Sequence, residues 1–253
     1  MTAESEADVQ GLAACGALVR RVFEQLKAAA RPGVTTASLD AIAEREFARA
    51  GALSAPRHYY DFPGATCISV NPEAAHGIPG PRRLRDGDLV NIDVSAVLNG
   101  YVADMGESFV VGVGRQKKRA GRERIARAVR QGVWAAIEQV RPGRSLNVIG
   151  MAAQAVADRY GYQIVDNLGS HGVGRHIHEE PSYVPKPDPR ERRRLLPGMV
   201  LTIEPFFTTG APWVDEGDDG WTLMAGPDAL IAQYEQTVIV REDGPLVVTA
   251  ARS

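Results

Sequence analysis

The sequence predicts an α/β fold of the α+β kind: a mainly antiparallel sheet with helices on its outer face, in two halves related by a pseudo-twofold axis. Arg-Pro-Gly occurs at residues 31–33 and again at 141–143, each time between two segments with helical periodicity. A turn containing Gly, followed by an apolar run and an acid, ends at Asp93 and again at Glu204. Because these matches share an offset of about 110 residues, we expect one domain over residues 1–253, with halves at about 1–110 and 111–253.

Each half begins with two predicted helices separated by the Arg-Pro-Gly turn, where Pro and Gly end the first of them. That first helix has its apolar residues close to i, i+3, i+4 and i+7, which gives Val19, Val22, Phe23 and Leu26, then Val129, Val133, Trp134 and Ile137. The second helices run to Gly51 and Gly161, and their N-cap candidates are Thr35, Thr36 or Ser38, and Ser145.

The composition is that of an ordinary globular protein, with 44% hydrophobic residues and 29 Lys+Arg against 31 Asp+Glu, a formal charge of −2. The balanced charge gives no general reason to expect DNA binding. We expect no membrane span, because no apolar run approaches the roughly 20 residues required, and the acidic first ten residues differ from a basic secretory signal. Cys15 and Cys67 are expected to be buried thiols in a reducing compartment, which predicts a cytoplasmic protein.

Residues 91–104 predict a β-hairpin, because Asn99-Gly100 between two apolar runs is typical of a two-residue turn. In that register Ser95 lies opposite Asp104, and Asp93 shares their face of the sheet, with the two carboxylates roughly 7 Å apart or less between Cβ atoms. Two acids so placed need a positive group between them. The alternative is that one of them faces solvent or pairs with an arginine.

The other acids at strand ends, and a histidine cluster, favour the first interpretation. Glu204 occupies the position equivalent to Asp93, and Glu235 precedes the apolar run 237–240. A set of several carboxylates with few histidine nitrogens suits divalent ions such as Mn²⁺, Fe²⁺, Co²⁺ or Zn²⁺. The histidines concerned are His171, His176 and His178, together with His76, whose His-Gly-Ile echoes His171-Gly-Val; His58 has no such echo, and His176 stays unassigned.

These motifs occur in the order found in a known family. The chain resembles the type I methionine aminopeptidases, a group of pita-bread metallopeptidases, over nearly its whole length. The resemblance rests on residues 67–71 leading to His76-Gly-Ile-Pro, Asn91-Ile-Asp93 with Asp104, His171-Gly-Val-Gly-Arg with His178-Glu-Glu-Pro, Thr202-Ile-Glu-Pro205, and Gln233-Tyr-Glu-Gln236. It implies the pseudo-symmetric pita-bread fold and hydrolytic removal of N-terminal methionine from nascent polypeptides, preferentially before a small, uncharged second residue.

The resemblance also implies site residues and cofactors. Two divalent ions, from among Co, Mn, Fe, Zn and Ni, are expected on Asp93, Asp104, His171, Glu204 and Glu235. Asp93 would bind one ion, His171 and Glu204 the other, and Asp104 and Glu235 would bridge them. The implied catalytic residues are His76 and His178, which would contact the substrate, and Glu204, which would carry a proton. The implied walls of the methionine pocket are Tyr59, Phe62, Cys67 and Trp221.

The sequence departs from the family pattern at two places. Met105-Gly106 follows Asp104 where relatives often carry hydroxyl residues, and the pocket segment 56–62 also differs. One rival interpretation is an aminopeptidase P or prolidase, but such enzymes usually carry a separate N-terminal domain, for which we expect no room in this sequence. The other two rivals are a type II enzyme and a non-catalytic binding module. The basic runs 115–124 and 190–194 are expected to be solvated loops or, as a second hypothesis, weak contacts with ribosomal RNA. We expect a monomer.

Overall fold

The computed structural model describes residues 1–114, 119–184, 187–188 and 190–250. Four of its helices lie where the sequence predicts them, and the short α3 (Ala55–Tyr60) was not predicted. The first half holds α1 (Glu6–Ala29), α2 (Thr36–Ala50) and the short α3 (Ala55–Tyr60), and the second half holds α4 (Arg119–Ile137) and α5 (Asn147–Tyr160). Thr35 caps α2 by accepting a hydrogen bond from the Ser38 N–H, and Gly51 ends that helix at φ 64°. At α5 the N-cap is Leu146 instead of the expected Ser145. The Ser145 hydroxyl nevertheless accepts a hydrogen bond from the N–H of Asn147, the first residue of the helix.

The backbone confirms the repeat between the halves. Gly33 donates its N–H to the Leu84 carbonyl at 2.8 Å, and Gly143 donates to the Leu195 carbonyl at the same distance. Isolated bridges follow at equivalent positions, between Thr35 and Arg83 and between Ser145 and Arg194. Each Arg-Pro-Gly turn is therefore tied to the segment that enters the acid-bearing strand of its own half.

The paired strands of the described chain are antiparallel throughout and form four sheets. The first has the order β1-β4-β2, with β5 on β4: β1 (Leu53–Ser54), β2 (Cys67–Val70), β4 (Leu89–Leu98) and β5 (Tyr101–Val110). The largest has the order β15-β14-β9-β7-β8: β7 (Ser170–Gly172), β8 (Glu179–Val184), β9 (Val200–Ile203), β14 (Gln236–Ile239) and β15 (Leu246–Val247). The two smaller sheets are β13-β10-β6 and β11-β12-β3: β3 (Glu73–Ala75), β6 (Gln163–Ile164), β10 (Phe206–Thr208), β11 (Asp215–Glu216), β12 (Leu223–Met224) and β13 (Ile231–Gln233).

The β4–β5 hairpin has the predicted register. Asn99 and Gly100 both have positive φ, 51° and 76°, as a type I′ turn requires. Leu98 pairs with Tyr101, and Ser95 pairs with Asp104. The turn therefore fixes which face of the strands carries the two acids.

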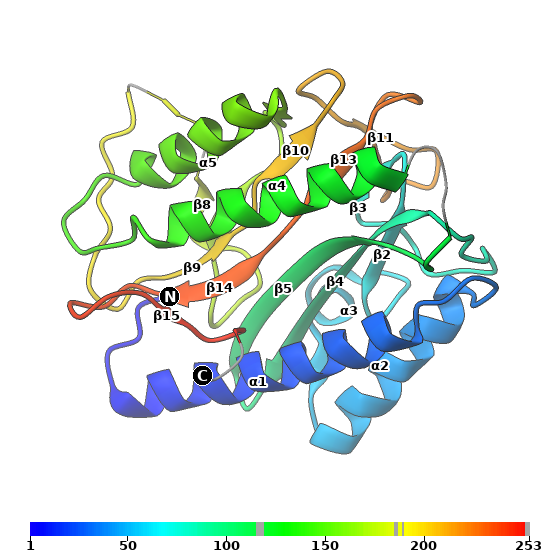
Figure 1. Ribbon diagram of the computed structural model, residues 1–253. Coiled ribbons are helices and arrows are strands. Elements are labelled where there is room, and N and C mark those ends of the chain that lie inside the picture. The colour runs from blue at the N-terminus through cyan, green and yellow to red at the C-terminus, as the bar shows by residue number, and fades with distance from the viewer. Residues whose placement is uncertain (115–118, 185–186, 189, 251–253) are drawn as a thin grey trace.

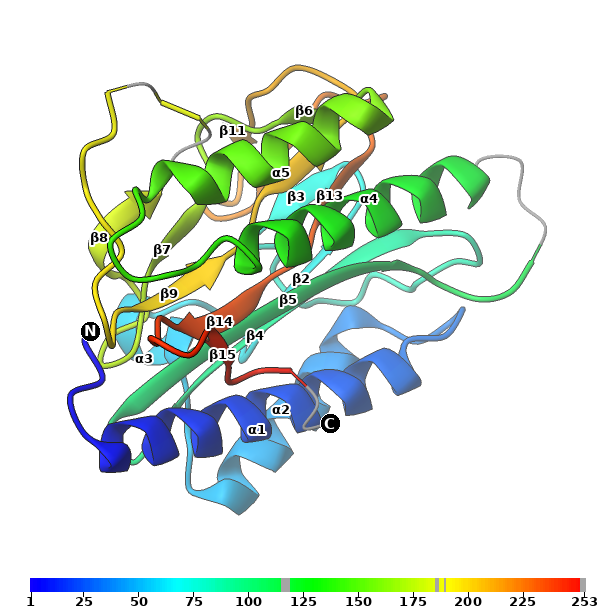
Figure 2. The same cartoon turned by 60° about the vertical axis from the view of Figure 1, so that its left-hand side comes forward.

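Helices cover the strands in two layers, one for each half. In both views α1 and α2 lie along one side of the molecule and α4 and α5 along the other, with β5 and β14 running between them (Figures 1 and 2). One apolar core packs α1 and α2 on β4, and another packs α4 and α5 on β9 and β14. Cys15 and Cys67 are buried free thiols, as expected. None of the helices in the described part of the chain is long and apolar enough to cross a membrane.

Candidate metal centre and active site

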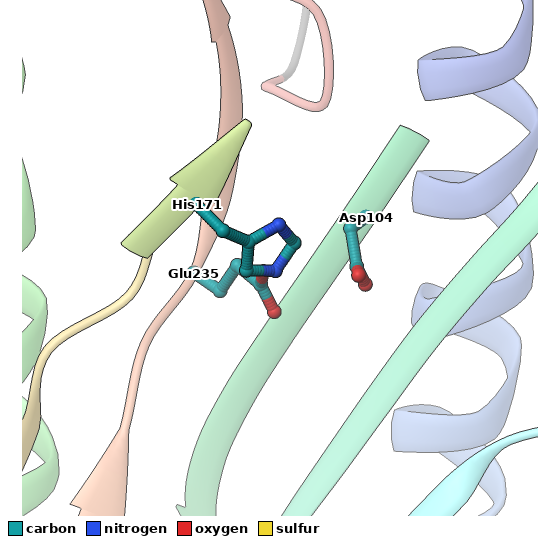
Figure 3. Close-up of side chains that lie close together, drawn as sticks. All are labelled: Asp104, His171 and Glu235. Carbon is teal, nitrogen blue, oxygen red and sulfur yellow. The ribbon is translucent and has the colours of Figure 1, made fainter. Parts of the chain in front are cut away.

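The five predicted metal ligands come from strands of both halves and face one cavity of about 390 Å³. They are Asp93 on β4, Asp104 on β5, His171 on β7, Glu204 directly after β9, and Glu235 between β13 and β14. Ligand atoms of Asp104, His171 and Glu235 all lie within 4.8 Å of one another, and Figure 3 shows these three side chains converging. The fold therefore brings together residues that are widely separated in the sequence.

The acids of this cluster are in an environment that opposes their charge. Burial, together with the charge of Glu204, raises the pKa of Asp93 to about 7. Burial and the neighbouring carboxylates raise the pKa values of Asp104 and Glu235 well above the ordinary range. Burial by itself would lower the pKa of His171, but its hydrogen bond to Glu204, 3.0 Å from Nε2 to Oε1, gives a net rise. Such a cluster needs a cation to hold its acids ionised.

The side chains present fit a divalent metal ion. Asp104 Oδ1 is buried and has no hydrogen-bond partner among the residues that the structure describes. A buried carboxylate oxygen is rarely left without one, so this atom is oriented for a ligand from outside the chain. Four carboxylates and one imidazole form an oxygen-rich donor set, which suits divalent ions of the first transition row.

A buried glutamine holds two of the acids in place. Gln233 donates from Nε2 to Glu235 Oε2 at 3.0 Å and to Glu204 Oε2 at 3.4 Å. Its own carbonyl oxygen accepts from Asn91 Nδ2 at 2.7 Å. Glu204 also accepts from the Thr202 hydroxyl at 3.0 Å. Hydrogen bonds of this kind orient metal ligands and tune their basicity.

Gly106 explains how the site accommodates the unusual Met105-Gly106 sequence. A Cβ at residue 106 would run into Gln233 Oε1 and lie 2.8 Å from its Cδ and Nε2. The glycine therefore makes room for the amide that supports Glu204 and Glu235. The sequence analysis assigned no role to Gln233. The sequence feature that could have indicated one is the glycine opposite Asp93, and that pairing follows only from the register of the hairpin.

The two histidines that the resemblance assigns to the substrate also line the cavity. His76 has φ 54°, a left-handed conformation that a residue other than Gly adopts at a cost and that is common at functional sites. The His178 ring lies 4.3 Å from the His171 ring, centroid to centroid. Burial lowers the pKa of His76, and burial together with the charge of His171 lowers that of His178 to about 4. Both imidazoles are therefore neutral near pH 7.

The other two histidines are not among the residues that line this cavity. His176, left unassigned by the sequence, packs against the Tyr59 ring with a centroid distance of 5.2 Å. His58 makes an edge contact with the same ring. His58, which has no echo in the other half of the sequence, therefore lies outside the cavity.

The predicted pocket walls lie on the cavity with one exception. Phe62, Cys67 and Trp221 line it, and the Phe62 and Trp221 rings meet edge to face at 5.2 Å. Tyr59 does not line it, and its hydroxyl instead donates to the Arg175 carbonyl at 2.8 Å. Tyr60 lines the cavity in its place, because successive side chains on a helix such as α3 point about 100° apart. Further lining residues that the sequence did not predict as pocket walls are Pro56, Ser95, Leu168, Ile177 and Phe206.

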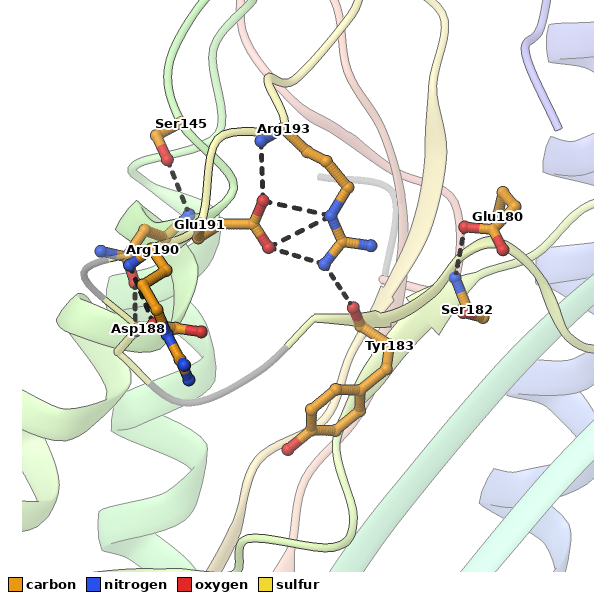
Figure 4. A network of polar contacts seen from close by, with 9 residues as sticks. Ser145, Glu180, Ser182, Tyr183, Asp188, Arg190, Glu191 and Arg193 are labelled. Carbon is orange, nitrogen blue, oxygen red and sulfur yellow. Dashed lines mark hydrogen bonds and ion pairs between the residues drawn. The ribbon is translucent and has the colours of Figure 1, made fainter.

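Two arginines of the second basic run, Arg190 and Arg193, are paired with acids. Arg193 contacts Glu191 at 2.6 Å and donates to the Tyr183 carbonyl at 2.8 Å, and Arg190 pairs with Asp188 at 3.3 Å (Figure 4). These pairs reduce the positive charge that the run presents. Of the first run, residues 115–118 lie outside the described residues.

Comparison with known proteins shows the family to which the chain belongs. The model of metallopeptidase family M24 matches residues 10–242. The chain therefore belongs to this family and is a metal-dependent hydrolase, which confirms the resemblance and the predicted fold.

The relatives specify the class further. The chain is 44% identical to a methionine aminopeptidase of Staphylococcus epidermidis over 98% of both chains. It is 36% identical to methionine aminopeptidase 2 of Bacillus subtilis over 98% of this chain and 99% of the relative. The crystal structure of methionine aminopeptidase from Rickettsia prowazekii is similar with a TM-score of 0.91 and 32% identity, over 99% of this chain and 100% of that one.

A prolidase shares the fold but is a longer protein. The structure of the prolidase from Pyrococcus furiosus matches with a TM-score of 0.74 and 22% identity. The match covers 98% of this chain and 65% of the prolidase. This similarity shows a common fold, and the longer prolidase chain agrees with the expectation that such enzymes carry a further domain.

Proposed function

We propose that this protein is an aminopeptidase that removes the N-terminal methionine of newly made polypeptides when the second residue is small and uncharged. The observation that carries the proposal is a single cavity in which four carboxylates and one imidazole face a partly aromatic wall. The full-length similarity to methionine aminopeptidases supports the same activity. Nascent chains are then the partner, and the cytoplasm is the expected compartment.

The residues that would hold two divalent ions are Asp93, Asp104, His171, Glu204 and Glu235. Bound divalent ions supply a water ionised near neutral pH and polarise a carbonyl oxygen. Mn, Fe, Co, Ni and Zn all suit this donor set. The choice among them rests on metal titrations of the purified protein.

The side chains around the metal ligands bind and orient the substrate. Phe62, Cys67 and Trp221 provide the apolar surface for the methionine side chain, and the buried position of Cys67 raises the pKa of its thiol and keeps it neutral. His76 and His178 are neutral and can donate a hydrogen bond to the peptide carbonyl or its developing oxyanion. Glu204 can accept a proton at a carboxylate oxygen and return it to the leaving amine.

Substitution of one central ligand tests the proposal. Asp104→Asn or Glu235→Gln should abolish metal-dependent release of methionine from a Met-Ala-Ser peptide, because each change removes an anionic oxygen from the buried cluster. Glu216→Gln, at an exposed carboxylate on β11, should leave release unchanged. Full activity of either central variant after chelation and metal add-back would refute the site.

The rival functions make different predictions. A prolidase-like enzyme would cleave Xaa-Pro peptides in the same assay and spare Met-Ala-Ser. A non-catalytic module would bind no stoichiometric metal after dialysis against Mn²⁺ or Co²⁺. We expect release from Met-Ala-Ser, none from Xaa-Pro peptides, and metal at stoichiometric amounts.

Two finer proposals concern assembly and partners. We propose a monomer and a weak, salt-sensitive contact with ribosomal RNA through the basic runs, since phosphate contacts come from such clusters. The pairing of Arg190 and Arg193 with acids limits what residues 190–194 can contribute. Ribosome co-sedimentation that does not fall as salt rises would rule out this contact.

A further inference from the structure

The helix α3 contacts the segment that carries His178 through two consecutive tyrosines. Tyr59 donates to the Arg175 carbonyl at 2.8 Å, and the Tyr60 oxygen lies 2.5 Å from His178 Nδ1. The helix belongs to the first half of the chain, and His178 to the second. Tyr60 therefore joins the two halves at a side chain of the cavity.

The geometry of this bond fits either donor, the tyrosine hydroxyl or Nδ1–H of the histidine. Burial raises the pKa of Tyr60, so its hydroxyl keeps its proton. If Nδ1–H donated instead, the hydroxyl hydrogen would have to bond to solvent, to which Tyr60 is 45% exposed. A bond from Tyr60 to an unprotonated Nδ1 satisfies both groups.

The other ring nitrogen must then carry the proton. A neutral imidazole has one N–H, so Nδ1 as acceptor makes Nε2 the donor. The ring is packed between Tyr60 and His171, with centroid distances of 5.5 and 4.3 Å. Rotation of the ring is thus restricted on one side by packing and on the other by the hydrogen bond.

We propose that Tyr60 is a positioning residue, whose hydroxyl fixes the ring of His178 in the tautomer that offers Nε2–H to the carbonyl oxygen of the substrate. The inference deepens the proposed function and rests on it for the identity of the acceptor. The hydrogen bond and the tautomer themselves do not depend on which peptide is cleaved.

The exposure of Tyr60 makes a clean test possible. Its side chain is 45% exposed, so Tyr60→Phe removes a hydroxyl without opening a cavity in the core. The matched control is Tyr160→Phe on α5, which removes a hydroxyl bonded to Gln131 Oε1 at 3.0 Å, away from the cavity. Each variant loses one tyrosine hydrogen bond at a partly exposed position.

The kinetic test separates positioning from binding. Loss of a group that orients a metal-ligating histidine costs about 10–100-fold in metal affinity or activity, and we apply the same scale to the orientation of His178. For Tyr60→Phe we expect a fall of about tenfold or more in kcat on Met-Ala-Ser, with KM within about threefold of wild type, and no change for Tyr160→Phe. A rise in KM at unchanged kcat, or unchanged values of both, would overturn the proposal.

A spectroscopic readout separates failure of this inference from failure of the proposed function. Histidine ¹⁵N resonances of the zinc-reconstituted protein distinguish protonated from unprotonated ring nitrogens, and His178→Gln assigns the signals. Wild type should show an unprotonated Nδ1 and a protonated Nε2, and Tyr60→Phe should shift this population. Identical His178 spectra in the two proteins refute the positioning role. An altered His178 spectrum combined with no methionine release by wild type would contradict the function and leave the hydrogen bond established.

Discussion

Gly106→Ala tests whether the room left by this glycine lets Gln233 support the proposed metal ligands Glu204 and Glu235. The added Cβ would run into Gln233, which is 1% exposed and whose amide contacts Asn91, Glu204 and Glu235. Overpacking costs about 1–3 kcal/mol, and a lost hydrogen bond to a charged group about 1.5–3 kcal/mol. We therefore expect a loss of about 2.5–6 kcal/mol in the free energy of unfolding and a roughly 10–100-fold fall in metal affinity.

Urea unfolding and a titration with Mn²⁺ or Co²⁺ measure the two effects. The control is Gly121→Ala, in helix α4, where an added Cβ would lie 3.6 Å from its nearest neighbour, Leu230 Cδ1. That change should stabilise the protein by about 0.5–1 kcal/mol, because Ala favours a helix over Gly. If Gly106→Ala unfolds and binds metal like wild type, the Gln233 amide moves freely and the argument for its supporting role fails.

Three further predictions concern pH, the buried acids and helix packing. The pKa of Asp93 is raised to about 7 in the fold, so the folded metal-free protein holds a proton that the unfolded chain releases. The melting temperature of the metal-free protein should therefore fall as the pH rises from about 5 to 7.5. A melting temperature that stays constant or rises over this range would contradict the prediction. Asp93→Asn should therefore raise the melting temperature of the metal-free protein at about pH 7.5 while weakening metal binding, and a lower melting temperature would count against buried repulsion. Gly132→Ala would place a Cβ 2.7 Å from Phe207 Cζ, where α4 packs on β10, and should cost about 1–3 kcal/mol in urea unfolding; wild-type stability would show that the ring can yield.

Local rules were enough to predict the parts of the site that depend on one turn. Asn99-Gly100 requires positive φ at both residues, so the register of β4 and β5 follows, and with it the shared face of Asp93 and Asp104. The Arg-Pro-Gly turns similarly placed the two helix pairs, because Pro and Gly stop one helix and a cap begins the next. These predictions use only neighbouring residues, for which sequence pattern and structure are directly linked.

Other parts depend on contacts that no local pattern encodes. Tyr59 and Tyr60 are adjacent and identical in type, and the six-residue α3 is too short to show a periodicity that would indicate which one faces the cavity. The contact of Gly106 with Gln233 joins strands from opposite halves. The family pattern emphasised the ligands themselves, whereas the groups that hold them in place are set by tertiary packing.

A departure from the symmetry of the halves explains why His76 and His178, the two histidines proposed to face the substrate, are held differently. Both lie on the cavity wall, one from each half, so the repeat alone would make them equivalent. The helix α3 has no counterpart between α5 and β7, and it reaches across to His178 through Tyr60. His76 instead has a left-handed backbone, followed by a hydrogen bond from the Gly77 N–H to the Ser69 hydroxyl at 3.0 Å. Loss of the Tyr60 hydroxyl should therefore alter the spectrum of His178 and leave that of His76 unchanged, a contrast that a general loosening of the cavity would not produce.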